Sequence, residues 1–218
     1  SDWENNLPSY FKLAYLPQPG LVRLRLSVQK ENNETFQKEF DCQIEKLKVL
    51  ISELIYGYDE ARLEEVIGKL LKAKGQSIST AESCTGGMIA SSIVSINGSS
   101  NIFKSSIVTY SNSMKSKLLN IPLSIIETNG AVSEQTAYHM ALNVLLLMKA
   151  DISIAVTGIA GPTGGSINKP VGLVWIAIGT KLKVFQKKYL LNGNRLEIRQ
   201  KTTLESLKFA NKIITEYF

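Results

Sequence analysis

Along residues 59–218, short apolar runs alternate with stretches whose apolar residues recur at helical spacing. The short runs predict buried strands, and the periodic stretches predict amphipathic helices. Strands are expected at 77–81, 106–110, 152–156, 172–179 and 184–190, and helices at 63–71, 85–96, 113–119, 134–149 and 194–217. We expect Asp59 to cap the first helix and Ser133 the fourth. Strands that alternate with helices predict an α/β fold, here a three-layer α/β/α sandwich with a largely parallel sheet.

Residues 1–58 carry a different pattern and are expected to form a small α+β unit. Apolar and polar residues alternate over 22–28, which predicts a half-buried strand. Residues 1–18 show no such pattern, and we interpret them as irregular, with a proline-rich turn at their end. A polar turn at 31–34 is expected to lead into a helix over 42–55.

The composition is that of an ordinary globular chain: 218 residues, 44% hydrophobic and 20% charged. The longest apolar runs, such as 171–179, are far shorter than the ~18 residues that a membrane span needs. No secretion leader opens the chain, and Ser1 in place of methionine indicates a processed chain or a fragment. Two cysteines, Cys42 and Cys84, cannot build a disulfide framework and suit a reducing compartment. We therefore expect a cytoplasmic protein with no membrane partner.

The histidine count and the distribution of charge limit the catalytic bases and the ligands that the chain can use. The single histidine, His139, lies in an apolar helical run and is interpreted as an ordinary helix residue. A nucleophilic serine would therefore need another base, and lysine is the obvious one. Residues 1–58 hold 7 lysines and arginines against 8 acidic residues, whereas residues 59–218 hold 18 against 11. A basic second part favours anionic ligands, although a solvated lysine-rich surface is the plainer explanation.

Three polar segments follow predicted strands, at 79–88, 109–115 and 157–166, and the first and third contain glycines. Because ligands of open α/β sheets gather at the carboxyl ends of the strands, we predict that these segments form one small-molecule pocket. Ser83 stands at the bend before Gly86 and Gly87, where backbone N–H groups of a helix start can hold an anion. A tight turn with Ser83 or Thr85 as a helix cap is the alternative.

Lys115 lies in the first turn of a predicted helix that follows Tyr110. The helix macrodipole and partial burial would both lower the pKa of its amine. Such a lysine can act as a base toward a serine hydroxyl, directly or through the Tyr110 phenol. Arg195, at the start of the last helix, is a candidate phosphate clamp. An exposed lysine and a surface arginine are the alternatives.

Four motifs, TAESCTGG (80–87), VTYSNSMK (108–115), GAVSEQT (130–136) and TGIAGPTGGSINKPVGLVWIA (157–177), resemble the C-terminal domain of the CinA family. That family includes nicotinamide-mononucleotide amidohydrolases, so the resemblance implies hydrolysis of the mononucleotide carboxamide to nicotinate mononucleotide and ammonia, without metal or cofactor. It implies that Ser83 is the nucleophile, with Lys115 and Tyr110 as the catalytic base pair. The implied substrate-binding residues are Glu82, Thr85, Gly86, Gly87, Thr157, Gly158, Gly161 and Arg195, with Arg199 as the alternative arginine.

Residues 5–58 resemble the KH-like linker domain of full-length CinA proteins, which divides the chain into a linker domain (1–58) and an amidohydrolase domain (59–218). Because the linker segment lacks a GXXG loop and is net acidic, we do not expect nucleic-acid binding. We expect these residues not to include the molybdopterin-binding-like domain of the longer family members, so ADP-ribose pyrophosphatase activity is not assigned. We expect a homodimer or higher homo-oligomer. Nucleotide binding without turnover, or an interaction module linked to competence or DNA damage, are the alternative functions.

Overall fold

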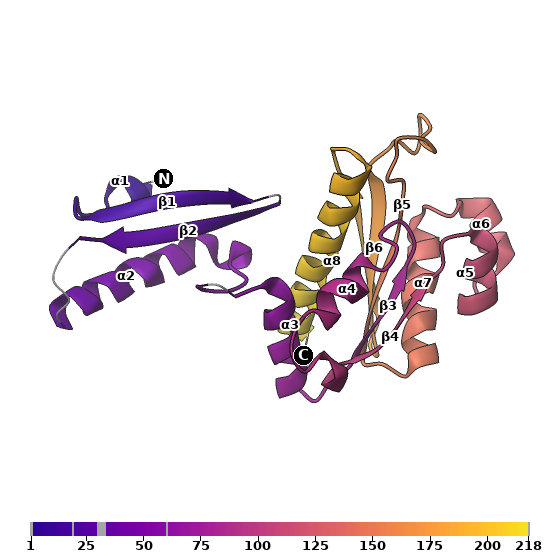
Figure 1. Ribbon diagram of the computed structural model, residues 1–218, viewed down its shortest axis with the longest axis horizontal. Coiled ribbons are helices and arrows are strands. Elements are labelled where there is room, and N and C mark those ends of the chain that lie inside the picture. Colours follow the sequence, from indigo (N-terminus) through magenta and orange to yellow (C-terminus); the bar gives the residue numbers. More distant parts are fainter. Residues whose placement is uncertain (1, 19, 30–33, 60, 218) are drawn as a thin grey trace. The chain divides into compact units, whose positions relative to one another are not determined.

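The computed structural model describes residues 2–18, 20–29, 34–59 and 61–217 (Figure 1). The chain divides into two compact units, residues 1–58 and 59–218, which are described separately below. Within the described residues, none of the helices has the length and apolar character needed to cross a membrane.

The first unit is a hairpin with helices. It consists of α1 (Asp2–Asn5), β1 (Phe11–Gln18), β2 (Leu21–Val28), α2 (Glu34–Ile51) and a short 3-10 turn, η1 (Ser52–Leu54). The strands pair antiparallel from Phe11 opposite Val28 to Gln18 opposite Leu21. The buried Phe11 ring stacks on Phe40 of α2 at a centroid distance of 6.2 Å.

Two expectations for this unit are wrong. The segment interpreted as irregular contains β1, because a strand with a single partner has a free edge and tolerates a proline such as Pro17. The helix expected from residue 42 begins at Glu34. Of the predicted polar turn at 31–34, residues 31–33 lie outside the described residues and Glu34 is the first residue of α2.

The second unit is built on a five-stranded sheet in the order β4-β3-β5-β6-β7. Its strands are β3 (Ile78–Glu82), β4 (Phe103–Val108), β5 (Ile152–Gly158), β6 (Leu173–Thr180) and β7 (Val184–Leu190). The α/β class is confirmed. The sheet is mixed, however: β3 runs parallel to β4 and β5, whereas β6 is antiparallel to both β5 and β7. The reason is the connection, since a parallel neighbour needs a crossover helix and β5 is joined to β6 by a loop alone.

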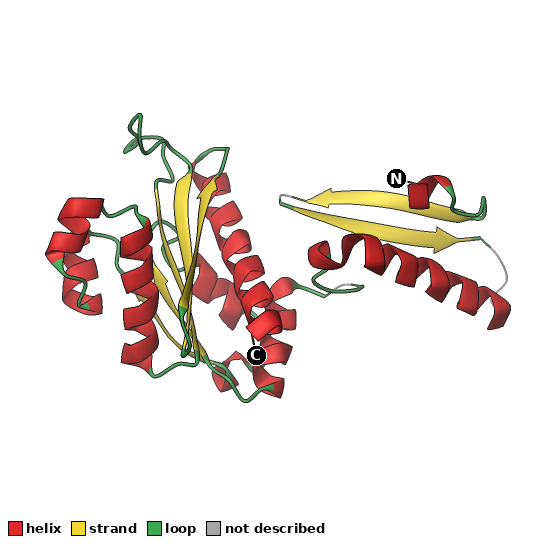
Figure 2. Ribbon diagram, turned by 180° about the vertical axis from the view of Figure 1, so that it is seen from behind, coloured by secondary structure: helices red, strands yellow, loops and turns green. Residues whose placement is uncertain are grey.

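Helices cover both faces of this sheet, which gives three layers (Figure 2). The helices are α3 (Leu63–Ala73), α4 (Met88–Val94), α5 (Asn112–Leu119), α6 (Leu123–Asn129), α7 (Glu134–Met148) and α8 (Arg195–Tyr217), with a 3-10 turn η2 (Ser99–Asn101). α7 packs along one face with α5 and α6 outside it, and α4 and α8 pack on the other face with α3 beside α8. As predicted, Ser133 caps α7 by accepting a hydrogen bond from the Thr136 N–H at 3.2 Å.

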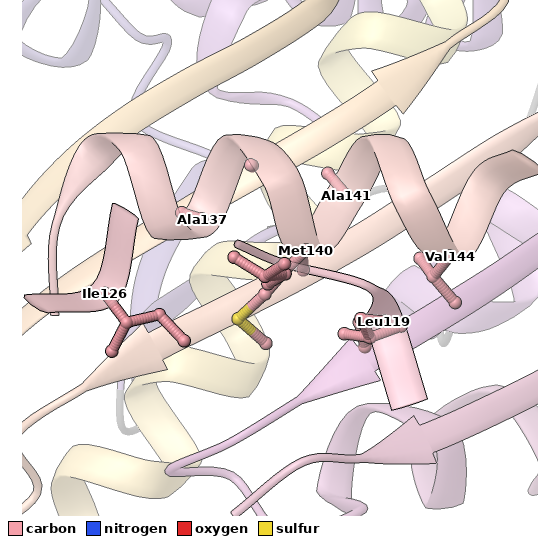
Figure 3. Close-up of a cluster of buried hydrophobic side chains, with 10 residues drawn as sticks. Leu119, Ile126, Ala137, Met140, Ala141 and Val144 are labelled. Carbon is pink, nitrogen blue, oxygen red and sulfur yellow. The ribbon is translucent and has the colours of Figure 1, made fainter. Parts of the chain in front are cut away.

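The core under α7 keeps the central strands in register (Figure 3). Met140 and Val144 of α7 pack with Leu119 of α5 and Ile126 of α6. Beneath them a row of alanines crosses three strands, with Ala81 paired to Ala155 and Ala155 to Ala177. Small side chains let the helix approach the sheet closely. The strand register, with Glu82 paired to Val156, brings the ends of β3 and β5 to one level.

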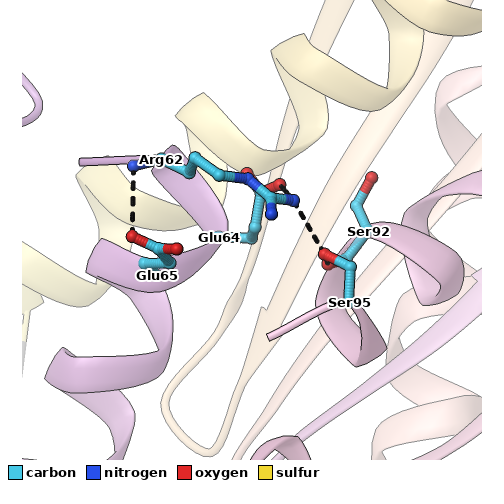
Figure 4. Close-up of polar contacts among 5 residues, drawn as sticks. All are labelled: Arg62, Glu64, Glu65, Ser92 and Ser95. Carbon is cyan, nitrogen blue, oxygen red and sulfur yellow. Dashed lines mark hydrogen bonds and ion pairs between the residues drawn. The ribbon is translucent and has the colours of Figure 1, made fainter. Parts of the chain in front are cut away.

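The start of α3 differs from the prediction (Figure 4). Its N-cap is Arg62 and not Asp59, which lies three residues earlier with a φ of 56°. The Glu65 carboxylate accepts the Arg62 N–H at 3.5 Å, and the Arg62 guanidinium contacts Glu64 and donates to the Ser95 hydroxyl at 2.8 Å. The cap therefore ties the start of α3 to the end of α4.

Candidate functional site

Ser83 lies in a tight turn directly after β3. The Gly86 N–H donates to the Ser83 carbonyl at 3.1 Å, which closes a four-residue turn. Gly86 and Gly87 follow with φ angles of 60° and 96°, a left-handed region that side chains disfavour. The Ser83 N–H donates to the Val156 carbonyl of β5 at 3.2 Å, so the turn is anchored to the sheet. The chain thus bends sharply at Ser83, which is 8% exposed.

Glu82 organises the helix that follows this turn. Its fully buried carboxylate accepts hydrogen bonds from the Thr85 hydroxyl and from the backbone N–H groups of Gly87, Ile89 and Ala90. These donors belong to the turn and the first residues of α4, where the helix macrodipole favours an anion. The structure therefore uses the side chains of Glu82 and Thr85 inside the protein and does not present them to a ligand.

Lys115 is brought directly to Ser83. Ser111 caps α5 by accepting the Met114 N–H at 3.2 Å, and Lys115 follows in the first turn. Its Nζ lies 3.0 Å from the Ser83 Oγ and donates to the Thr109 carbonyl at 2.9 Å. The Lys115 side chain is 1% exposed, and among the described residues no carboxylate forms an ion pair with it.

Burial lowers the pKa of the Lys115 amine, because removal from water disfavours the charged form. A neutral amine has two N–H donors and one lone pair. With one N–H directed to the Thr109 carbonyl, the lone pair can accept the Ser83 proton. The arrangement contains a hydroxyl, a base and a group that orients the base, which is the geometry of an activated nucleophile.

Tyr110 lies apart from the hydrogen bond between Ser83 and Lys115. Its side chain is 60% exposed, and its phenol oxygen accepts a hydrogen bond from the Arg195 guanidinium at 2.6 Å. Within the part of the chain that the structure describes, no hydrogen bond joins this phenol to Ser83 or Lys115. A second Arg195 nitrogen donates to the Gly161 carbonyl at 2.7 Å. Tyr110, Arg195 and Gly161 therefore form a chain of contacts that joins the end of β4, the start of α8 and the glycine loop.

Asn194 positions Arg195 by capping α8. Its side-chain oxygen accepts the N–H groups of Leu196 and Glu197 at 2.9 and 3.0 Å, and the Glu197 carboxylate accepts the Asn194 N–H at 2.9 Å. This reciprocal pair is a capping box. It places the exposed Arg195 at the first residue of the helix, beside the glycine loop.

Thr157 and Gly158, two further predicted residues, lie at the end of β5. The Thr157 hydroxyl is 1% exposed and donates to the Ala131 carbonyl at 2.7 Å. Gly158 packs so closely that a Cβ there would lie 2.7 Å from Val174 and 3.2 Å from the Cys84 sulfur. The two residues thus bring the end of β5 against the Ser83 turn, and neither offers a free side-chain donor.

Neither of the other polar candidates near the sheet competes with Ser83. Burial raises the pKa of the Cys84 thiol to about 12, which leaves it protonated and a poor nucleophile. His139 lies on α7 with its ring edge-on to Tyr138 at 5.3 Å. Over the described ranges, no group of three or more histidine, cysteine, aspartate or glutamate residues is arranged to hold a metal ion.

Sequence reasoning missed two functions of residues near Ser83. It gave Glu82 to the substrate, although an acid a few residues ahead of a helix is a signal for capping. It treated Arg199 only as a possible phosphate ligand. In the structure, the Arg199 guanidinium donates to the carbonyls of Cys84 and Thr85 at 3.1 and 2.8 Å.

Together, the fold and the site define an α/β domain with a buried serine–lysine pair at the carboxyl end of its central strands. A family model described as the CinA C-terminal domain matches residues 60–214. The chain belongs to the CinA family.

Similar proteins agree with this assignment. A CinA-like protein of Flavobacterium psychrophilum is 44% identical over 217 residues, which cover 99% of this chain and 52% of that protein. A putative competence-damage inducible protein of Caldanaerobacter subterraneus is 40% identical over 203 residues, 93% of this chain and 49% of that protein. The chain thus spans about half the length of these curated relatives.

Two solved structures each match about seven-tenths of this chain. The competence damage-inducible protein A (ComA) of Klebsiella pneumoniae superposes with a TM-score of 0.70 at 29% identity, covering 72% of this chain and 97% of that one. The competence/damage inducible protein CihA of Agrobacterium tumefaciens gives a TM-score of 0.65 at 39% identity, covering 70% and 96%. The mixed α/β architecture described above is therefore that of CinA-superfamily structures.

Proposed function

We propose that the chain hydrolyses the carboxamide of nicotinamide mononucleotide to nicotinate mononucleotide and ammonia, in pyridine nucleotide salvage. The observation that carries the proposal is the contact between the Lys115 Nζ and the Ser83 Oγ at 3.0 Å, in a setting that lowers the pKa of the amine. An amide is a poor electrophile, so its hydrolysis needs both an activated nucleophile and a donor for the departing nitrogen. A lysine that first accepts and then returns a proton supplies both.

In the proposed first step, Lys115 takes the proton of the Ser83 hydroxyl as the Oγ bonds to the carboxamide carbon. The resulting tetrahedral oxyanion collapses, the carbon–nitrogen bond breaks, and the Lys115 ammonium gives its proton to the leaving group, which departs as ammonia. Water then attacks the Ser83 ester, passing one proton to Lys115. Ser83 leaves as the alcohol after recovering that proton, and the product acid releases its remaining proton to water as it becomes the carboxylate.

The oxyanion requires N–H donors, and the turn leaves few of them free. The Gly86 N–H is given to Ser83 and the Gly87 N–H to Glu82. Among the described residues, the Thr85 N–H is one of the turn's donors without an acceptor, and we assign the oxyanion contact to it rather than to the glycines.

We assign the nucleotide phosphate to Arg195. Its guanidinium is exposed and, in the described part of the chain, donates only to neutral acceptors, the Tyr110 phenol and the Gly161 carbonyl. A phosphate is a stronger partner for a guanidinium than either of these. Tyr110 then serves as a binding residue beside the phosphate, or turns toward Ser83 once Arg195 is engaged by the ligand.

The test is ammonia release from nicotinamide mononucleotide by the purified chain. Ser83→Ala should lower kcat by at least about 1,000-fold, because the covalent route is lost. Ser91→Ala, which changes an exposed serine of α4, is the matched control and should retain activity. If Ser83→Ala kept more than a tenth of the activity, a serine nucleophile would be excluded. If the unaltered chain bound the mononucleotide without releasing ammonia, the domain would be a binding module.

The same proposal includes assembly. We propose that the chain forms a homodimer or higher homo-oligomer with a cytoplasmic location, and that residues 1–58 act as a KH-like linker. Light scattering of the purified chain tests the first point, since a monomer at micromolar concentration would contradict it.

A further inference from the structure

We propose that Arg199 is a positioning residue, which holds the turn after Ser83 so that the Thr85 N–H faces the developing oxyanion. The inference rests on the proposed serine mechanism and concerns a residue that does not itself contact the substrate. Three features of the turn support it.

The first feature is the geometry of the turn. The hydrogen bond from the Gly86 N–H to the Ser83 carbonyl makes Cys84 and Thr85 its two central residues. Thr85 is not among the residues with positive φ, so the turn is not type II, which needs a positive φ at that position. Type I and type II turns differ mainly by a flip of the peptide between the central residues. That flip would reverse both the Cys84 carbonyl and the Thr85 N–H.

The second feature is what Arg199 contacts. Its Nε donates to the Cys84 carbonyl at 3.1 Å, and a terminal nitrogen donates to the Thr85 carbonyl at 2.8 Å. In a trans peptide the C=O and the following N–H point in opposite directions. Holding the Cys84 carbonyl toward α8 therefore directs the Thr85 N–H away from α8. The two hydrogen bonds oppose the peptide flip.

The third feature is the way the surroundings accommodate the guanidinium. A Cβ on residue 86 would lie 3.3 Å from the Arg199 terminal nitrogen, so Gly86 leaves room for this approach. Across the described residues, no carboxylate pairs with Arg199. Its charge is thus not neutralised by an acid. The guanidinium lies on the α8 side of the turn, and the negative charge of the oxyanion would develop on the opposite side. Both the orientation and the charge favour the oxyanion.

The experiment compares Arg199→Met and Arg199→Lys with the unaltered chain on two substrates, nicotinamide mononucleotide and the corresponding riboside without phosphate. A positioning role predicts that Arg199→Met lowers kcat by about 100-fold on both substrates, because a small misplacement of an oxyanion donor costs that much. KM should change little, and Arg199→Lys should recover part of kcat by holding one carbonyl. A rise in KM confined to the mononucleotide would instead make Arg199 the phosphate ligand and overturn the inference.

A pyridinylboronic acid gives a second readout, because its boron becomes tetrahedral when Ser83 attacks it. Its inhibition constant should rise in Arg199→Met in step with the loss in kcat, whereas binding of the planar product should not change. Equal losses for both ligands would point to general disorder of the site and contradict a positioning role. Lys212→Met, which removes an exposed lysine elsewhere on α8, is the control for changes to that helix.

The outcome does not depend on nicotinamide mononucleotide being the substrate. If the unaltered chain releases no ammonia, the proposed function fails, but the rate at which a fluorophosphonate labels Ser83 still tests the inference, since that reaction also builds negative charge on oxygen. A labelling rate at least about tenfold slower in Arg199→Met supports a positioning role. An unchanged rate overturns it.

Discussion

Burial of the Lys115 amine lowers folding stability and favours the amine as a base. Its amine is almost completely removed from water, and the groups within reach are the Ser83 hydroxyl and the Thr109 carbonyl, neither of which carries charge. Burial of a charged amine without a counter-ion is unfavourable, so the pKa of the amine falls. The lowered pKa is also what a lysine needs to act as a base near neutral pH.

This environment predicts a pH dependence of folding stability. The Lys115 pKa in the folded chain lies below 10.5, the ordinary value for a lysine, which applies when the chain is unfolded. Between the two values the unfolded chain binds more protons, so the free energy of unfolding rises with pH across that window. Each unit of pKa depression corresponds to about 1.4 kcal/mol of this free energy. Below the folded pKa, the cost of burying the charge is present in full.

Lys115→Met should therefore be more stable relative to the unaltered chain at neutral pH than at alkaline pH, while losing catalysis. Urea denaturation between neutral pH and the unfolded value measures the difference. The advantage of the variant should shrink as pH rises toward 10.5. Lys104→Met, which changes an exposed lysine of β4, is the control and should show no such trend. A difference independent of pH would mean that the pKa of the Lys115 amine is the same in the folded and the unfolded chain, which would contradict the prediction.

Some of the side-chain contacts in the site could be predicted from the sequence, and others could not. The pairing of Ser83 with Lys115 was predictable, because both follow parallel neighbouring strands whose carboxyl ends meet at one edge. The place of Tyr110 was not, since its exposed phenol is set by Arg195, 85 positions later in the chain. The carbonyl contacts of Arg199 have no residue-type signal either, because any backbone can accept them.

At the scale of elements, the start of α4 depends on Glu82. The side chain collects four donors from one turn and one helix start, which no cap residue on α4 itself supplies. Since the carboxylate is fully buried and accepts from every one of these donors, it must remain an acceptor at both oxygens.

Glu82→Gln should lower the free energy of unfolding by about 2 kcal/mol, because one acceptor becomes an NH2 group that faces backbone N–H donors. The Ser83 turn should loosen with it, so kcat should fall together with stability. Urea denaturation and ammonia release measure the two effects. Glu127→Gln changes an exposed glutamate of α6 and should stay within about 0.5 kcal/mol of the unaltered chain. Equal stability of both variants would show that the cap is dispensable.

Sequence periodicity located the two C-terminal elements well. The expected bounds of the last helix, at 194–217, and of the last strand, at 184–190, agree with α8 and β7. β1 was not predicted, because its residues lack a clean alternation of apolar and polar side chains and include Pro17. The direction of β6 followed from the connection rather than from its own residues, which are buried as in any central strand.

At the scale of the whole molecule, the candidate site belongs to the second unit alone. Ser83, Lys115, Tyr110, Arg195 and Arg199 all lie within residues 59–218, and so do the residues that orient them. The core beneath α7 is likewise made only of residues from this unit. A hydrophobic core of its own is what allows a domain to fold independently.

A chain reduced to residues 59–218 should therefore fold and release ammonia with a kcat within about twofold of the full chain, since neither the nucleophile, the base nor the phosphate ligand is removed. Circular dichroism establishes that the shortened chain is folded, and the ammonia assay then compares the two proteins at equal concentration. A folded but inactive 59–218 chain would show that residues 1–58 contribute to catalysis, which is the outcome that would move the site beyond the second unit. Retained activity would show that the first unit is not needed for catalysis.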